Sequence, residues 1–140
     1  MEENNFWAHH KKEIIFHEDK LNIIESCVDR HAKSNPNKFA LIFQDEKQKQ
    51  TITYLQLQEQ VNKYANVIDK LTHKNSRVFI FLPKIPELYI SLLATIKQGS
   101  IAAPLFEAFQ TQGLEMRLER GEANLLITNK ELSERLVNKI

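Results

Sequence analysis

The sequence is poor in the residues that break a chain or cross-link it. Its 140 residues include three glycines, four prolines and one cysteine. With so little glycine and proline, no segment is typical of a flexible linker or a low-complexity tract. The single cysteine, Cys27, excludes a disulfide within the chain and is typical of a reducing compartment, which predicts a cytoplasmic location.

Long hydrophobic runs and an excess of one charge are also missing. No apolar run approaches 18 residues, so we expect no membrane span, and the N-terminal segment lacks the apolar core of a secretory signal. The 19 basic residues balance 18 acidic ones, giving a net charge of +1, so nothing indicates a nucleic-acid partner. The composition is that of an ordinary globular protein, and the length predicts one domain.

Phosphate-binding motifs are absent as well. The sequence contains neither G-x-G-x-x-G nor G-x-x-x-x-G-K-[ST], and Gly99, Gly113 and Gly121 lie far apart. The sequence therefore lacks a glycine-rich loop whose backbone N–H groups could bind the phosphates of ATP. No Ser/His/Asp set has a local motif such as G-x-S-x-G either.

Residues 1–20 are polar with scattered apolar side chains, and we interpret them as an N-terminal arm that packs on the body or frays. The arm contains His9, His10 and His17. Zinc sites use four ligands at spacings such as C-x2-C with H-x3-H, which these histidines do not match. We therefore favour solvated or locally hydrogen-bonded histidines over a metal site.

The segment 77–106 predicts a strand, a helix and a second strand. RVFIFL is a continuous apolar run, typical of a strand buried on both faces of a parallel sheet. Pro86 stands at the first position of the helix and Gly99 at its end. The helix is expected to bury Leu88, Leu92 and Ile96, with Tyr89, Leu93 and Ala94 alongside. IAAPLF is then a second apolar strand, which completes a βαβ unit.

Similar patterns predict the elements on either side. We expect a helix over 22–34 capped by Asn22, a hairpin of strands 39–43 and 51–53, a helix after the capping box of Thr53 and Gln56, a helix opening at 110–112, a strand over 124–128 and a helix over 131–140. Cys27 is predicted to face the core with Ile24, Val28 and His31 rather than to act as a nucleophile. The fold class is α/β: a preceding hairpin, then a parallel βαβαβ sheet with helices on both faces, all within residues 21–140.

Ligands of such a sheet lie beyond the carboxyl ends of its strands, which here are the loops 83–86, 107–111 and 128–130. Glu107 is a candidate acid or base in a cleft, although we favour a solvated loop carboxylate. Lys84 would meet an anion as a point charge, and an exposed lysine is at least as favoured.

The stretch RVFIFLPKIPELYISLLATIKQGSIAAPLFEAF resembles the early part of the AMP-forming acyl-CoA synthetases of the adenylate-forming superfamily, and most of all the bacterial acetyl-CoA synthetases. ITYLQL (52–57) resembles the superfamily's first core motif and IKQGSIAAPLF (96–106) its second. The similarity runs from about residue 22 to 136 and covers only the beginning of a much longer enzyme. It implies the N-terminal part of the adenylate-forming fold, without the phosphate loop, the adenine and carboxylate pockets or the catalytic lid.

What the resemblance implies about function concerns the complete enzyme. That enzyme would activate acetate with ATP and Mg, and would pass the acyl group from AMP to CoA. Carried across by position, Phe106, Glu107, Phe109 and Arg135 belong to the CoA nucleotide site, where the arginine would hold the 3′-phosphate. The alternative for Arg135 is the polar face of a helix. No catalytic residue, metal ligand or cofactor is expected within this chain.

Two pairs of residues depart from the family pattern. Asn75 and Ser76 stand where a glycine and an aspartate are usual, and asparagine tolerates the left-handed conformation that glycine would supply. Arg120 and Gly121 replace an acidic and a small polar residue, which reverses a charge.

We therefore expect an N-terminal fragment of an acetate–CoA ligase, because the chain ends inside a helical pattern without a stop signal. It should be inactive alone, because the phosphate loop and the catalytic lid are missing. Its strands would lose neighbours at the cut edge, which favours aggregation. The expected partners are acetate, ATP and CoA for the complete enzyme, and the missing remainder or a second copy for this chain. The alternatives are a stand-alone α/β module that binds CoA, a nucleotide or another protein, and a degenerate remnant.

Overall fold

The computed structural model describes residues 10–17 and 20–136. Strand β5 (Arg77–Phe81) is the middle strand of its parallel sheet. It pairs in parallel with β6 (Ile101–Pro104) on one edge and with β7 (Leu125–Thr128) on the other, in the order β6-β5-β7. The buried side chains of β5 fit its uninterrupted apolar sequence. The predicted parallel βαβαβ sheet is confirmed.

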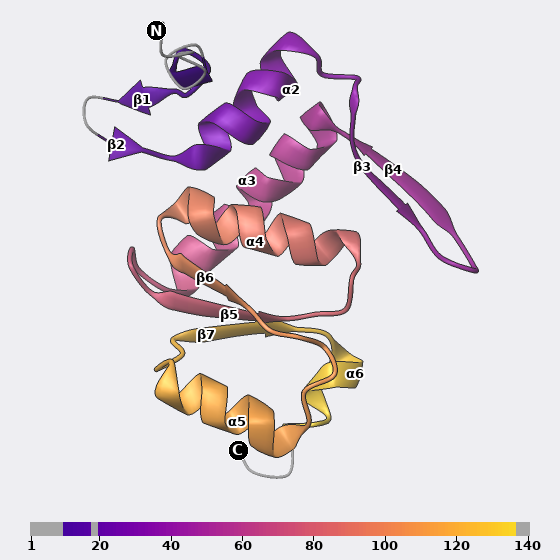
Figure 1. Cartoon of the computed structure of the whole chain (residues 1–140), viewed down its shortest axis with the longest axis vertical. Coiled ribbons are helices and arrows are strands. Elements are labelled where there is room, and N and C mark those ends of the chain that lie inside the picture. The colour runs from indigo at the N-terminus through magenta and orange to yellow at the C-terminus, as the bar shows by residue number, and fades with distance from the viewer. Residues whose placement is uncertain (1–9, 18–19, 137–140) are drawn as a thin grey trace, which may run out of the picture.

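Helices cover both faces of this sheet (Figure 1). On one side lie α3 (Tyr54–Leu71) and α4 (Pro86–Gln98), and on the other α5 (Thr111–Arg120) and α6 (Lys130–Ser133). Because successive side chains of a strand point to opposite faces, Val78 packs in the first apolar cluster and Phe81 in the second. Within the described residues, no helix is long and apolar enough to cross a membrane.

Most predicted helix ends are confirmed. Thr53 and Gln56 form the capping box at the start of α3, and Pro86 begins α4. Gly99 ends α4 in the left-handed conformation, with φ at 93°. Asn75 also has a positive φ, 66°, as its place in the turn before β5 predicts.

The buried face of α4 differs from the prediction. Leu88, Leu92 and Ile96 are only half-buried, whereas the fully buried side chains include Ile90, Ser91, Ala94 and Thr95. Apart from Ile90, the fully buried positions named here carry short side chains, which allow α4 to lie close to its neighbours, while Leu88, Leu92 and Ile96 lie at its sides. The prediction ranked positions by hydrophobicity alone and therefore missed the buried positions with short side chains.

The helix predicted over 22–34 contains a π-helical segment, η1 (Glu25–Asp29), before α2 (Arg30–Ser34). The wider turn shifts the buried side chains to Ile24, Val28 and Ala32. Cys27 is consequently exposed, and the prediction that it faces the core is wrong. Partial burial by its neighbours still raises the pKa of its thiol, which does not favour a nucleophile.

The predicted hairpin is present, with longer strands and a shorter turn. Strands β3 (Phe39–Gln44) and β4 (Lys49–Thr53) pair antiparallel and project from the body (Figure 1). The carboxylate of Asp45 accepts hydrogen bonds from the backbone N–H groups of Lys47 and Gln48, at 2.8 Å each, and these bonds lower its pKa. This local turn closes the hairpin earlier than composition alone predicts.

The two ends of the chain are described in part. Strands β1 (Phe16–His17) and β2 (Lys20–Leu21) pair antiparallel, and the N–H of Ile15 donates to Ser26 Oγ at 2.9 Å, so this part of the arm contacts the body. Among residues 10–17 and 20–136, no group of His, Cys, Asp and Glu is placed to hold a metal ion, and His9 lies outside the described residues. The helix predicted over 131–140 is shorter, because α6 ends at Ser133. Ile140 also lies outside the described residues.

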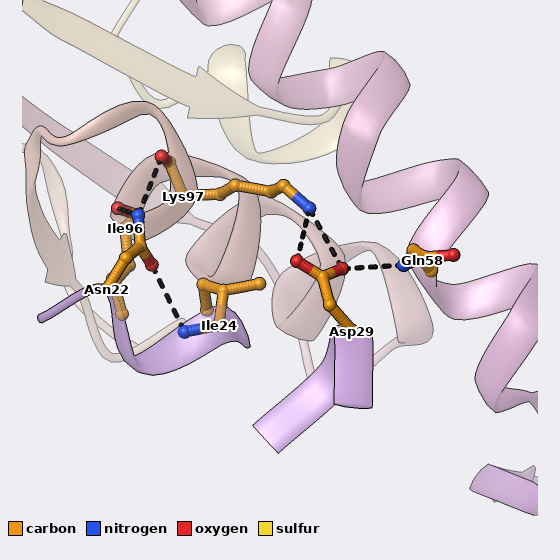
Figure 2. Close-up of polar contacts among 6 residues, drawn as sticks. All are labelled: Asn22, Ile24, Asp29, Gln58, Ile96 and Lys97. Carbon is orange, nitrogen blue, oxygen red and sulfur yellow. Dashed lines mark hydrogen bonds and ion pairs between the residues drawn. The ribbon is translucent and has the colours of Figure 1, made fainter. Parts of the chain in front are cut away.

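A polar network joins the first helix to α4 and α3 (Figure 2). Lys97 Nζ lies 2.9 Å from both carboxylate oxygens of Asp29, and Gln58 donates to the same carboxylate at 2.8 Å. The side-chain amide of Asn22 donates to the Lys97 carbonyl at 3.0 Å, and its oxygen caps the first helix by accepting from the N–H of Ile24. This network ties segments distant in sequence.

We predict that Asp29→Ala and Lys97→Ala each lower the free energy of unfolding by about 1–3 kcal/mol, because each leaves a partly buried charge without its partner. The double variant should lose less than the sum of the two, as a double-mutant cycle in urea would measure. Additive losses would contradict this coupling. Glu122→Gln, in the exposed pair with Arg77, is the control and should change stability by about 0.5 kcal/mol or less.

Gly121 explains one departure from the family pattern sterically. A Cβ there would lie 2.3 Å from Phe79 Cζ and 2.8 Å from the Arg117 carbonyl oxygen. The turn after α5 therefore approaches the sheet too closely for a side chain.

We predict that Gly121→Ala destabilises the fold by about 1–3 kcal/mol through this overlap. Gly113→Ala is the matched control: its added Cβ meets nothing closer than 3.5 Å, and alanine favours the helix by up to about 1 kcal/mol. Urea denaturation of both variants measures the difference, and equal stabilities would contradict the predicted overlap.

Candidate functional site

The carboxyl ends of the three parallel strands meet at one edge of the sheet, and the loops that follow β6 and β7 meet there. The N–H of Leu105 donates to the Ile80 carbonyl at 2.8 Å, which extends the β6–β5 pairing into the first loop. After β7, the side chain of Asn129 caps α6 by accepting from the N–H of Leu132 at 2.8 Å. Leu132 and Leu136 are buried on either side of Arg135, and they hold this turn against the sheet.

Arg135 connects the two loops. Its Nη1 donates to the Glu107 carbonyl at 2.6 Å and to the Phe109 carbonyl at 3.1 Å. Its own carbonyl accepts from Thr111 Oγ1 at 2.8 Å. The structure therefore brings Arg135 to the backbone of Glu107 and Phe109, and Phe106 contacts Phe109 within the same loop. These are the other residues that the resemblance singles out.

The loop whose carbonyls Arg135 contacts carries two aromatic rings, while the Arg135 guanidinium itself lies 5.9 Å from the centre of the Phe81 ring. The rings of Phe106 and Phe109 are 6.0 Å apart, edge to face. The guanidinium of Arg117 lies 3.8 Å from the centre of the Phe109 ring, and its Nη1 donates to the Gly113 carbonyl at 2.7 Å. Phe109 is half-buried by these contacts, whereas Phe106 is 59% exposed and offers a free ring face.

Arg135 and its neighbour Arg117 bring positive charge to these loops. Arg135 and Arg117 donate to neutral carbonyls, and within the described part of the chain neither pairs with a carboxylate. An arginine held in this way keeps its full charge for a ligand, and its planar fork suits a phosphate. We name Phe106, Glu107, Phe109 and Arg135 the loop cluster. Chemically it can bind an anion beside a stacking aromatic group, and it contains no nucleophile.

Sequence reasoning missed the residues that support the cluster. Thr111 and Arg117 lie on α5, and Asn129 lies at the start of α6. The Asn129 cap has a sequence signal, because asparagine before a helix is a common cap. The contact of Arg117 with Phe109 has none, because it depends on the path of the loop.

The sequence also offers Lys84 as an anion contact and the carboxylate of Glu107 as an acid or base. Lys84 is exposed and lines a groove of about 220 Å³ with Pro86, Tyr89 and residues of β3. Glu107 is half-buried and contributes its backbone carbonyl to the cluster. Neither observation favours general acid–base catalysis.

A family model described as AMP-binding enzyme matches residues 28–140. Acetyl-coenzyme A synthetase of Bacillus subtilis is 43% identical over 120 residues, which are 84% of this chain and 21% of that protein. That of Methanothrix thermoacetophila is 44% identical over 79% of this chain and 17% of its own length. Acetyl-coenzyme A synthetase 1 of Saccharomyces cerevisiae is 35% identical over 92% of this chain and 18% of its own length.

A solved structure of an acyl-CoA synthetase has a similar fold. The crystal structure of Brucella canis acyl-CoA synthetase has a TM-score of 0.83 and 25% sequence identity, over 94% of this chain and 24% of that chain. The chain therefore spans about a fifth of the length of the curated relatives it matches.

We predict that Thr111→Val loosens the junction of the two loops and lowers the free energy of unfolding by about 1 kcal/mol, because the Arg135 carbonyl loses its donor. Thr51→Val, at an exposed position of β4, is the control and should change stability little. Urea denaturation compares the two. If the two variants were equally stable, the Thr111 bond would not hold the loops.

Proposed function

This chain belongs to the AMP-binding enzyme family, and we propose that it supplies the N-terminal part of an AMP-forming acetate–CoA ligase. The observation that supports this most directly is the 35–44% identity to acetyl-CoA synthetases over most of the chain. The proposed whole enzyme makes acetyl-CoA from acetate, ATP and CoA through acetyl-AMP. The single cysteine supports a cytoplasmic location.

The loop cluster is the part of this chain that we assign to a ligand. The guanidinium of Arg135 is fixed by two backbone carbonyls and keeps its charge, which fits the 3′-phosphate of CoA. The exposed ring of Phe106 fits the adenine of the same nucleotide by stacking. From α5, Thr111 holds the Arg135 carbonyl, and Arg117 packs on the ring of Phe109, which in turn contacts Phe106.

No chemical step is assigned to this chain alone. Residues that would cradle the phosphates of ATP with its Mg²⁺ need a glycine-rich loop, and the glycines of this sequence lie far apart. ATP supplies the activation of acetate in the proposed whole enzyme, and the residues described here would instead orient CoA as the acyl acceptor. We therefore expect the isolated chain to be inactive.

A chimera tests the proposal: this chain replaces the matched region of the Bacillus subtilis acetyl-CoA synthetase. We expect the chimera to catalyse acetate-dependent ATP–pyrophosphate exchange and to form acetyl-CoA, and the isolated chain to do neither. Exchange by the isolated chain would refute its proposed dependence on the remainder. A soluble, folded chimera without exchange would count against the proposed function.

Arg135→Gln in this chimera tests the loop cluster. Since the exchange reaction needs no CoA, we predict that its rate stays unchanged while the KM for CoA rises about tenfold or more, the loss expected for a charged hydrogen bond. Arg120→Gln, an exposed position at the end of α5, is the control and should change neither. An unchanged KM for CoA, or equal losses in both reactions, would remove Arg135 from the site.

A further inference from the structure

A ligand that spans the loop cluster must pass Glu107. The ring of Phe106, the preceding residue, is 59% exposed, and Arg135 Nη1 lies 2.6 Å from the Glu107 carbonyl oxygen. Glu107 is therefore the residue between the proposed contact for the adenine and the proposed contact for the 3′-phosphate. In the nucleotide of CoA the ribose joins these two groups, so the ribose would lie beside Glu107.

A tight turn holds Glu107 in this position. The N–H of Phe109 donates to the Phe106 carbonyl at 3.1 Å, which places Glu107 and Ala108 at the two central positions of the turn. Arg135 holds the same turn through the carbonyls of Glu107 and Phe109. Because its backbone is fixed by these bonds, the Glu107 side chain leaves the loop from a defined point.

The carboxylate of Glu107 has no partner among residues 10–17 and 20–136. The residue is half-buried, yet no hydrogen bond or ion pair within those residues uses its side chain. Within the same residues, both side-chain hydrogen bonds of Arg135 use Nη1, which leaves Nε and Nη2 for a ligand. The loop cluster therefore offers one carboxylate and one guanidinium to the same ribose.

These two groups make opposite demands on a ribose. A carboxylate accepts hydrogen bonds from ribose hydroxyls, whereas an arginine accommodates a phosphate, and dinucleotide-binding sites distinguish the two kinds of nucleotide in this way. A glutamate is negative near neutral pH and so is a phosphate group. Since both would lie at one loop, within about one Debye length of 10 Å at 0.1 M salt, their repulsion is only partly screened.

From this arrangement we propose that Glu107 sets the choice of acyl acceptor: its carboxylate accepts hydrogen bonds from the ribose hydroxyls and opposes the 3′-phosphate. The site then takes 3′-dephospho-CoA, which has a free 3′-hydroxyl, as well as CoA. Both acceptors carry the same thiol, so the acyl transfer itself is the same. The inference rests on the proposed function and names the nucleotides that the loop cluster accepts.

The test measures the KM values of the chimera for CoA and for 3′-dephospho-CoA in acetyl transfer. We expect the unchanged chimera to use both, with KM values within about tenfold of each other. Glu107→Gln should raise the ratio of the KM for dephospho-CoA to the KM for CoA about tenfold, because it removes the repulsion and weakens the bond to the hydroxyl. Glu107→Asp keeps the charge and should preserve the ratio.

Two controls separate this role from a structural one. Glu119→Gln removes the same charge from the last turn of α5, about 12 Å along the helix from Thr111, and should leave the ratio unchanged. Raising the salt from about 50 mM to about 500 mM should shrink the effect of Glu107→Gln, because salt screens the repulsion. Loss of packing would instead change both KM values together, independently of salt.

An unchanged ratio in Glu107→Gln would overturn the proposal, and so would a preference of the unchanged chimera for CoA above about a hundredfold. Calorimetric titration with adenosine 3′,5′-bisphosphate and with adenosine 5′-phosphate repeats the comparison without catalysis. A shifted ratio of Kd values in a folded chimera that lacks ATP–pyrophosphate exchange would support the role of Glu107 and count against the proposed function. Failure to bind either nucleotide would overturn the role of Glu107. If the chimera is insoluble, the same titrations use the 140-residue chain.

Discussion

The pairing of β5 on both of its edges is the constraint on which the rest of the structure depends. Hydrogen bonds to β6 and β7 satisfy its backbone, so the strand can lie between two apolar clusters without unpaired polar groups. The pairing also continues beyond the strands. Leu105 bonds to Ile80 where the loop after β6 begins, and Asn124 bonds to Arg77 just before β7, which fixes the start of that strand. Because the strands are parallel, the loops after β6 and β7 meet at one edge, and a ligand site can form there.

Elements with strong local signals could be predicted from the sequence. The uninterrupted apolar run of β5, the capping box at Thr53 and the Pro86 and Gly99 ends of α4 each depend on a few adjacent residues, and each is confirmed. Features set by tertiary packing could not. The π-helical segment that exposes Cys27 has no local signature, and the inner face of α4 was chosen by closeness of packing rather than by hydrophobicity. The hairpin turn is a different case, because it depends on a local feature, the single carboxylate of Asp45, rather than on tertiary packing.

The loop cluster could be predicted only through a resemblance. Nothing in the spacing of Phe109 and Arg135 indicates that they meet, because their contact runs through a backbone carbonyl and the path of two loops. Family membership locates such residues where local pattern cannot, and the hydrogen bonds then supply a physical reason for their position. The supporting role of Arg117 lay beyond both approaches, since it depends on the ring that the loop places over α5.

β7 links the sheet to the loop cluster. The strand has one edge against β5 and the other exposed, and it leads directly through the Asn129 cap into the turn that holds Arg135. A half-paired strand opens more readily than an inner one, because fewer hydrogen bonds and less apolar packing hold it. Because β7 leads straight into this turn, the position of the Arg135 guanidinium depends on how firmly the strand is held.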